Sequence, residues 1–258
     1  MPAGAEPRSM DFARIEDVTL RYGEKIVLQH CNFTVKAQAI TCLIGLSGSG
    51  KSTMLRLLNG LRKPDSGRVI VKSTDIAVLH ARELDEFRQH IGFSFQFAAL
   101  FDSLTIFDNV ALPLRETTKM SEPDIKKTVL ATLESVGLEH VVDRMPAELS
   151  GGMLKRAGFA RAVVTNPDLV LYDEPTTGQD PIITHVLTNT IKRLRKQLNG
   201  TAVVVSHDLP SIFAMADYVA MLFEGAIIEY GTVEEVRKSE NPIVQQFLQG
   251  SEVGPIPL

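Results

Sequence analysis

The stretch Gly45-Leu46-Ser47-Gly48-Ser49-Gly50-Lys51-Ser52 decides the fold of this chain. It fits the pattern G-x-x-x-x-G-K-[ST], in which glycines let consecutive backbone N–H groups turn toward one centre and cradle phosphate oxygens. The ammonium of Lys51 can reach the outer phosphates, and the hydroxyl of Ser52 is a ligand for Mg²⁺, which keeps most of its shell as water and phosphate oxygen. The motif predicts a site for a nucleoside triphosphate and Mg²⁺.

The residues on both sides of this loop have the pattern that such a loop requires. Residues 39–44 are apolar and β-prone, which predicts a buried strand. Residues 54–58 predict a helix, whose positive N-terminal end would face the phosphates. The alternative is an ordinary Gly/Ser turn, and the strand and helix around the loop disfavour it.

The size and charge of the chain limit the classes of protein that it can be. Its 258 residues, 44% hydrophobic and 22% charged, are enough for one large domain or for a domain with a subdomain. The net charge of −4 gives no basic footprint, so nucleic acid is not an expected partner. We interpret Cys31 and Cys42 as small buried residues in a reducing compartment.

The sequence also indicates where the protein works. It has no apolar run of about 18 residues, so no segment is expected to span a membrane. Residues 1–10 lack the apolar core of a signal peptide, and residues 1–11 are expected to be a disordered leader. These features favour a cytoplasmic protein.

Apolar patterns along the chain predict an α/β fold. Residues 13–20 and 27–35 read as two strands ahead of the phosphate-binding loop. Residues 168–172 and 201–205 are nearly continuous apolar runs, typical of parallel strands that are covered on both faces. Further strands are predicted at 68–71, 91–96, 218–223 and 226–230, and helices at 81–90 and 183–198.

The character of the chain changes between these strands. From residue 97 to about residue 165 the pattern is mainly helical, with Ser121 and Ser150 as predicted N-caps. We therefore predict a P-loop NTPase core with a parallel sheet, an N-terminal antiparallel β subdomain and an inserted helical subdomain at 97–165. The domain would span residues 12–250, and residues 251–258 would form an extended C-terminal tail.

Two carboxylates end one of the predicted strands. Asp173 and Glu174 follow an apolar run that begins at Leu169. In P-loop enzymes a strand-end Asp binds Mg²⁺ through its water shell, and a second acid can orient and polarise the attacking water. The alternative is a pair of solvated acids, which the neighbouring phosphate-binding loop makes less favoured.

A second glycine-containing loop precedes a predicted helix. In Leu149-Ser150-Gly151-Gly152-Met153, Ser150 can cap the helix, and the glycines leave backbone N–H groups open to an anion. The loop is interpreted as a second phosphate site, so that one chain would contain two half-sites. The alternative is a helix N-terminus without this function.

The order of these motifs resembles the nucleotide-binding subunit of ATP-binding-cassette (ABC) transporters. The phosphate-binding loop, Gln96, Leu-Ser-Gly-Gly, Asp173-Glu174 and His207 occur in the family's order, over about residues 12–240. The resemblance implies an ABC ATPase fold, hydrolysis of ATP with Mg²⁺, and a homodimer that closes around ATP.

The resemblance also implies roles for particular residues. Tyr22 would stack on adenine, Gln96 would sense Mg²⁺, and Ser150 would contact the γ-phosphate on the other protomer. Glu174 would be the catalytic base, and His207 would hold the γ-phosphate. The ATP-binding residues would be Tyr22, Gly45, Ser47, Gly48, Ser49, Gly50, Lys51, Ser52, Thr53, Gln96, Ser150, Gly151, Gly152 and Asp180. The catalytic residues would be Glu174, His207 and Lys51, and the metal ligands Ser52, Gln96 and Asp173.

Departures from the family pattern point to a subfamily. Met153 replaces the usual Gln, and the loop that crosses the dimer interface reads Thr177-Gly178-Gln179-Asp180-Pro181. With the stretch 95–110 and the chain's ending, they resemble the ATPase of the Mla/MCE phospholipid transport systems. The resemblance implies a place on the cytoplasmic side of the inner membrane, with a permease, an MCE-domain lipid-binding protein and, in some systems, a STAS-domain protein as partners. The runner-up is an importer of amino acids or another small solute.

Four phenylalanines cluster around Gln96, and they leave two interpretations open. Phe95, Phe97, Phe101 and Phe107 are either all core residues or in part the wall of a groove for a permease helix. Rivals outside transport are ABC ATPases of DNA maintenance, which usually have long coiled-coil insertions, translation-associated proteins with two cassettes, and an ATP-gated module that does not hydrolyse.

Overall fold

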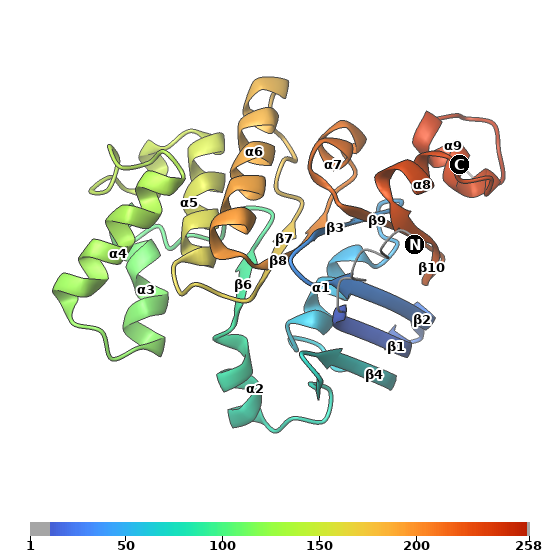
Figure 1. Cartoon of the computed structure of the whole chain (residues 1–258), viewed down its shortest axis with the longest axis horizontal. Coiled ribbons are helices and arrows are strands. Elements are labelled where there is room, and N and C mark those ends of the chain that lie inside the picture. Colours follow the sequence, from blue (N-terminus) through green and yellow to red (C-terminus); the bar gives the residue numbers. More distant parts are fainter. Residues whose placement is uncertain (1–10, 257–258) are drawn as a thin grey trace, which may run out of the picture.

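The computed structural model describes residues 11–256, and a six-stranded sheet forms its core (Figure 1). Strands β3, β8, β7 and β6 are parallel neighbours, β9 is parallel to β3, and β10 pairs antiparallel with β9. Every residue of β3 and β8 is buried, as expected for parallel strands covered on both faces. In spatial order the strands are β10 (Ala226–Thr232), β9 (Tyr218–Phe223), β3 (Ile40–Ile44), β8 (Thr201–Val205), β7 (Leu169–Asp173) and β6 (Ile91–Ser94).

A second sheet is antiparallel and packs over helix α1 (Lys51–Leu58). This helix contacts β4 of the second sheet on one side and β7 and β8 of the core sheet on the other. Its four apolar residues after position 53 are completely buried, so the helix is fixed from both sides together with the loop before it. The strands are, in spatial order, β2 (Lys25–Lys36), β1 (Asp11–Tyr22), β4 (Ser66–Val71) and β5 (Thr74–Asp75).

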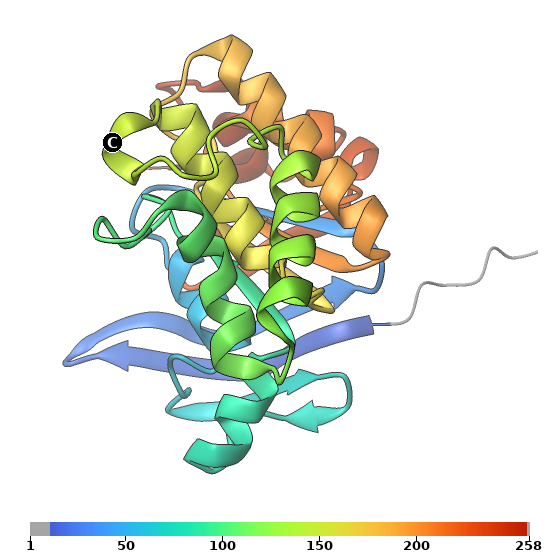
Figure 2. The ribbon, with the colours of Figure 1, turned by 90° about the vertical axis from the view of Figure 1, so that its left-hand side faces the viewer.

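Helices cover the opposite side of the molecule, as Figure 2 shows for the green to orange helices above the blue strands. The long helix α6 (Pro181–Leu198) packs between α5 and α7 (Leu209–Met215). The helices of the predicted insertion are α3 (Ile106–Thr117), α4 (Glu122–Ser135), the 3-10 helix η1 (Pro146–Glu148) and α5 (Gly151–Val163). Outside these groups lie α2 (Ala81–Arg88), α8 (Val233–Arg237) and α9 (Pro242–Gln249).

One aromatic pair attaches the helical subdomain to the sheet. Phe159 of α5 and Tyr172 of β7 are both buried, and their rings meet edge to face with centroids 5.1 Å apart. Such a pair contributes about 0.5–1.5 kcal/mol beyond the burial of its area. The helix that begins at Gly151 is therefore packed directly on the strand that ends in the two carboxylates.

An ion-pair cluster joins α3 to α4. The guanidinium of Arg115 donates to Asp108 Oδ1 at 2.9 Å and to both carboxylate oxygens of Glu122 at 3.0 Å. These hydrogen bonds favour the ionised acids and hold the pKa of Asp108 and that of Glu122 below their ordinary values.

Most predicted elements are present, with shifted ends. The strand predicted at 201–205 coincides with β8, whereas β6 ends at Ser94 because a turn begins there, closed by a 2.9 Å hydrogen bond from Ala98 N to Phe95 O. No helix within residues 11–256 is long and apolar enough to cross a bilayer. Of the predicted leader only Asp11 is described, as the first residue of β1, and the rest lies outside the described residues.

The predicted extended tail is wrong for the part that the structure describes. Residues 251–256 bend back over α9, and Ile256 is only 4% exposed. The side-chain amide of Gln246 donates to the carbonyls of Ser251 and Ile256 and accepts from Ile256 N at 2.7 Å. A buried amide needs such partners, and here the tail supplies them.

Candidate functional site

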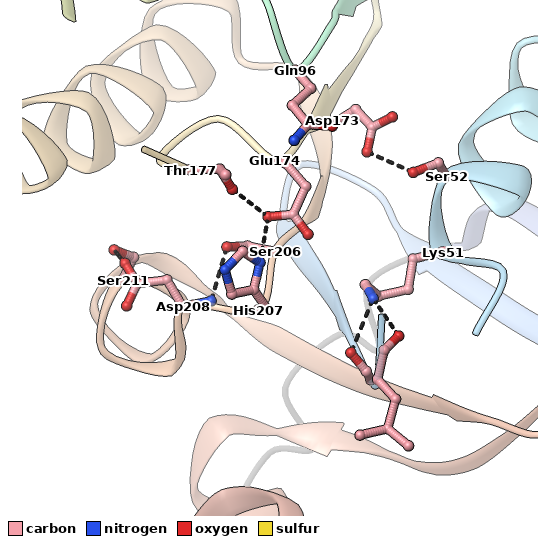
Figure 3. A network of polar contacts seen from close by, with 12 residues as sticks. Lys51, Ser52, Gln96, Asp173, Glu174, Thr177, Ser206, His207, Asp208 and Ser211 are labelled. Carbon is pink, nitrogen blue, oxygen red and sulfur yellow. Dashed lines mark hydrogen bonds and ion pairs between the residues drawn. The ribbon is translucent and has the colours of Figure 1, made fainter. Parts of the chain in front are cut away.

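The loop between β3 and α1 has a backbone that only glycine allows at its first position. Gly45 has φ +145°, and a Cβ there would lie 2.2 Å from the carbonyl oxygen of Leu222. The ammonium of Lys51 donates to Gly45 O at 2.9 Å and to Leu46 O at 2.8 Å (Figure 3). Burial lowers the pKa of Lys51, and the two carboxylates at the end of β7 oppose that shift. The loop thus surrounds the ammonium of Lys51 and holds it through two of its own carbonyls.

A pocket of about 500 Å³ opens over this loop and brings together residues from five separate parts of the chain. Val27 of β2, whose sequence context predicts a strand and no binding role, also lines it. The predicted site residues in the wall of the pocket are Tyr22, Ser47, Gly48, Gly50, Lys51, Ser52, Thr53, Gln96, Glu174 and His207. Gly45 and Ser49 belong to the same loop, but within residues 11–256 they are not part of the pocket wall.

Tyr22 ends β1 at the mouth of the pocket. It is 41% exposed, and the guanidinium of Arg62 lies over its ring, 5.1 Å from the centroid. An exposed ring at a pocket mouth suits stacking on a flat base. The same exposure also fits the alternative, a surface tyrosine beside a turn.

A hydroxyl and a carboxylate meet between α1 and β7. Ser52 Oγ donates to Asp173 Oδ1 at 2.9 Å (Figure 3). Burial raises the pKa of Asp173, the hydrogen bond from Ser52 lowers it, and the neighbouring charge of Glu174 raises it further. With the amide of Gln96 nearby in the pocket wall, these groups are the hard oxygen donors that Mg²⁺ prefers. The residues present therefore fit a magnesium ion.

Glu174 is held in a strained backbone conformation. Its φ of +49° lies in the left-handed region that few non-glycine residues adopt. Its N–H donates to Val205 O at 2.9 Å, which pins it to the end of β8. Its carboxylate accepts from Thr177 Oγ1 at 2.8 Å and lies 2.9 Å from Nδ1 of His207 (Figure 3). Strain of this kind is often found at functional sites.

Thr177 is a further partner of Glu174 and is not among the predicted site residues. The turn after β7 returns the chain so that residue 177 faces residue 174, with a backbone hydrogen bond of 3.4 Å from Thr177 N to Glu174 O. A hydroxyl residue three positions after a strand-end acid is a weak signal for this contact.

The second glycine-containing loop, residues 149–153, lies at the start of α5. Ser150 caps α5 as predicted, accepting from Met153 N at 3.4 Å, and Ser150 and Gly151 are exposed. Met153 packs against the apolar core. Gly152 meets α6 closely, because a Cβ there would lie 2.6 Å from Cγ2 of Ile183. Within residues 11–256 the loop contributes nothing to the wall of the pocket over Lys51.

Asp180 is also separate from the pocket, and it has a local structural role. Its Oδ1 accepts from the N–H groups of Ile182 and Ile183 at 2.9 and 3.0 Å, which caps α6. The sequence offered this signal, an Asp followed by Pro at the first helical position. One chain thus brings one group of predicted residues together and leaves Ser150, Gly151, Gly152 and Asp180 apart from it.

Comparison with known proteins identifies the family. The family model described as ABC transporter matches residues 28–177, which include the phosphate-binding loop and both carboxylates. The chain belongs to the ABC transporter family. It is 42% identical over 248 residues to the intermembrane phospholipid transport system ATP-binding protein MlaF of Haemophilus influenzae, covering 96% of this chain and 94% of MlaF. It is 39% identical to the probable ribonucleotide transport ATP-binding protein mkl of Mycobacterium tuberculosis, covering 94% of this chain and 67% of mkl.

A solved structure supports the same family. The ATP-binding cassette MJ0796, a dimer in a post-hydrolysis state bound to ADP and Pi, matches with a TM-score of 0.79 at 32% identity. The match covers 86% of this chain and 98% of that chain. The predicted ABC ATPase fold is confirmed, as is the resemblance to the Mla-type ATPases, and the chain is an ATPase of the ABC type.

Proposed function

We propose that this chain hydrolyses ATP to power phospholipid movement between bacterial membranes. The observation that supports this most is its 42% identity to MlaF over nearly the whole of both chains. The name of mkl, which is 39% identical, indicates a different cargo. An importer of amino acids or another small solute is the alternative that the tests below must exclude.

The pocket over Lys51 is the proposed ATP site. The backbone N–H groups of the loop and the ammonium of Lys51 bind the phosphates, and Tyr22 stacks on the adenine. Ser52, Asp173 and Gln96 would hold Mg²⁺, which when bound neutralises charge on the phosphates. The raised pKa of Asp173 supports this, because a buried carboxylate gains from a neighbouring cation.

Glu174 is the proposed general base. Its carboxylate is in the pocket wall, and it would accept the proton of a water that attacks the γ-phosphate. His207 lies 2.9 Å from that carboxylate and would hold a γ-phosphate oxygen as charge develops. Thr177 orients the carboxylate through its 2.8 Å hydrogen bond.

Two copies of the chain would complete each site. Ser150 and Gly151 are exposed and away from the pocket of their own chain, and the N–H groups of the α5 N-terminus suit a phosphate. We propose that they contact the γ-phosphate bound to Lys51 of a second copy, and that Asp180 lies at this interface. ATP then joins the two copies, and hydrolysis lets them separate.

A groove beside β6 is the proposed permease site. It has a volume of about 470 Å³ and is lined in part by Phe93, Phe95, Phe101 and Leu112. Phe95 and Phe101 are 41% and 52% exposed, whereas Phe107 packs against the core. We propose that a permease helix fills this groove on the cytoplasmic side of the inner membrane, in a complex with an MCE-domain protein and, as in some systems of this type, a STAS-domain protein.

Mixed dimers test the composite site. Two differently tagged copies are co-expressed and dimers containing both tags are purified. With Lys51→Ala in one copy and Ser150→Arg in the other, one complete site remains and phosphate release is expected. With both changes in the same copy, each site has one lesion and no release is expected. The reverse pattern would show that each chain forms its own site.

Purification of the tagged chain from its native membranes tests the cargo. Mild detergent and mass spectrometry of proteins and lipids should recover a permease, an MCE-domain protein and phospholipid. A permease accompanied by a solute-binding protein would leave the ATPase in place and remove phospholipid as the cargo.

A further inference from the structure

Lys155 of α5 is a buried cation that the proposed mechanism does not use. It is 6% exposed, yet its ammonium has two partners far apart in the sequence. One is the backbone carbonyl of Gln96, and the other is the backbone carbonyl of Glu174, at 3.1 Å. A single side chain therefore joins the loop after β6 to the residue proposed as general base.

Burying this ammonium is unfavourable unless its charge and its donors are matched. Burial lowers the pKa of Lys155, while the carboxylates of Glu174 and Asp173 raise it. The carbonyls of Gln96 and Glu174 occupy two of its three donors. The two carbonyls and the two nearby carboxylates therefore offset the cost of burying the Lys155 ammonium.

The loop that Lys155 contacts is itself strained and attached to the same helix. Ala98 and Ala99 have φ of +59° and +50°, two successive left-handed residues that are not glycine. The guanidinium of Arg161 donates to both of their carbonyls at 2.8 Å. Gly158 lets the loop approach, because a Cβ there would lie 3.1 Å from Cβ of Ala98. Helix α5 thus holds the loop after β6 at three carbonyls.

We infer that Lys155 is a positioning residue, which transmits the position of the loop after β6 to the backbone of Glu174. This inference rests on the proposed role of Glu174 in ATP hydrolysis. The N–H of Glu174 donates to Val205 O, and its carbonyl accepts from Lys155 and, at 3.4 Å, from Thr177 N. Together with the hydrogen bond from Thr177 Oγ1 to the carboxylate, these contacts maintain the φ of +49° and aim the carboxylate. A permease helix in the groove beside β6 would move Gln96 and, through Lys155, Glu174.

The chain offers a matched control on the same helix. The guanidinium of Arg156 also donates to two backbone carbonyls, those of Val136 and Gly137 at 2.9 and 3.1 Å, at the end of α4. Removing these donors perturbs α5 in the same chemical way without touching Gln96 or Glu174. A general loosening of α5 would affect the Arg156 and Lys155 variants alike.

The experiment measures kcat and KM for ATP, nucleotide affinity and melting temperature of the full chain with Lys155→Met, Lys155→Arg and Arg156→Met. Lys155→Met should lower kcat by about tenfold or more with KM and affinity within about twofold of the parent, because an interaction made with the base and not with ATP is lost. Lys155→Arg keeps the charge and several donors and should recover most of kcat. Arg156→Met should keep kcat within about twofold.

Other results would overturn the inference. A Lys155→Met chain whose kcat equals that of the parent excludes the positioning role while leaving the ATPase intact. Parallel losses of kcat and melting temperature in both Met variants would make Lys155 only a stabilising residue. If Lys155→Met does not fold, Lys155→Gln, which keeps an uncharged donor, must show the same loss of kcat at unchanged KM. A parent chain that binds ATP without hydrolysing it would remove the proposed function and this inference together.

Discussion

Replacing Asp173 by Asn is expected to stabilise the nucleotide-free chain and to remove the stabilisation that Mg²⁺-ATP provides. Burial raises the pKa of Asp173 above the ordinary value of 3.8, so the folded chain favours the neutral carboxyl. Asn has nearly the same shape, has no charge, and its oxygen can still accept the 2.9 Å hydrogen bond from Ser52. The proposed function thus needs a negative charge on Asp173 that the folded chain without nucleotide disfavours.

The sign of the pH dependence follows from this shift. A carboxyl whose pKa is raised on folding contributes stability that is present below its unfolded pKa and is lost as pH rises through its folded pKa. The Asn variant should therefore have a larger free energy of unfolding than the parent at pH 7. This difference should shrink as the pH falls and Asp173 of the parent becomes protonated. Removing this disfavoured charge is expected to raise the free energy of unfolding by about 0.5–2 kcal/mol, the size of a typical stabilising substitution. For a domain of this size each kcal/mol raises Tm by about 2–4 °C.

With bound nucleotide, the parent should be more thermally stable than the Asn variant. Mg²⁺-ATP at a hundred times its Kd stabilises the parent by about 2.7 kcal/mol, and a variant without the carboxylate gains little. Thermal unfolding of Asp173→Asn and parent, with and without Mg²⁺-ATP, measures both effects, and Asp143→Asn at an exposed position is the control. The reasoning would be refuted by an Asn variant that is less stable than the parent at pH 7 without nucleotide. It would also be refuted by a difference in stability that does not shrink as the pH is lowered.

Three further predictions test packing, backbone and charge. Phe159→Leu should lower the free energy of unfolding by about 1–2 kcal/mol, since it removes one ring of the pair with Tyr172 and leaves a small cavity; a double-mutant cycle in urea that gives no coupling would contradict the packing. Gly45→Ala should abolish ATP binding, because the added Cβ would lie 2.2 Å from Leu222 O, and an unchanged fluorescent-nucleotide titration would exclude this. Arg115→Gln should lower the urea midpoint at pH 7, and it should lower it less below about pH 4. The reason is that the stability from the two carboxylate partners of Arg115 is lost as pH falls through their lowered folded pKa values. Equal differences in midpoint at both pH values would argue against this.

The sequence allowed the local elements of the site to be predicted because each has a local cause. The strand at 201–205 is a continuous apolar run and coincides with β8. Helix α5 begins directly after Ser150, whose side chain caps it. Helix α6 begins at Pro181, two residues before the predicted start, because Asp180 caps the helix and proline fits its first position.

The contacts that the sequence could not reveal join residues far apart in the chain. Nothing near Lys155 indicates that its ammonium reaches both residue 96 and residue 174, since the two carbonyls meet only when β6 and β7 pair. The tail was expected to be extended from its prolines, but Gln246 binds it through three backbone groups. Backbone groups have no sequence signature, so side chains that bind them escape a reading of motifs.

Helix α5 unites these long-range contacts in one rigid element. Its N-terminus presents Ser150, its middle holds Glu174 through Lys155, and its C-terminal half holds the loop after β6 through Arg161. Phe159 of this helix packs on Tyr172 of β7, so a shift of the helix would disturb this aromatic contact. If Ser150 meets ATP on a second copy, closing of the dimer acts on the same helix that contacts the proposed base and the proposed permease groove. On this proposal, helix α5 links hydrolysis to transport.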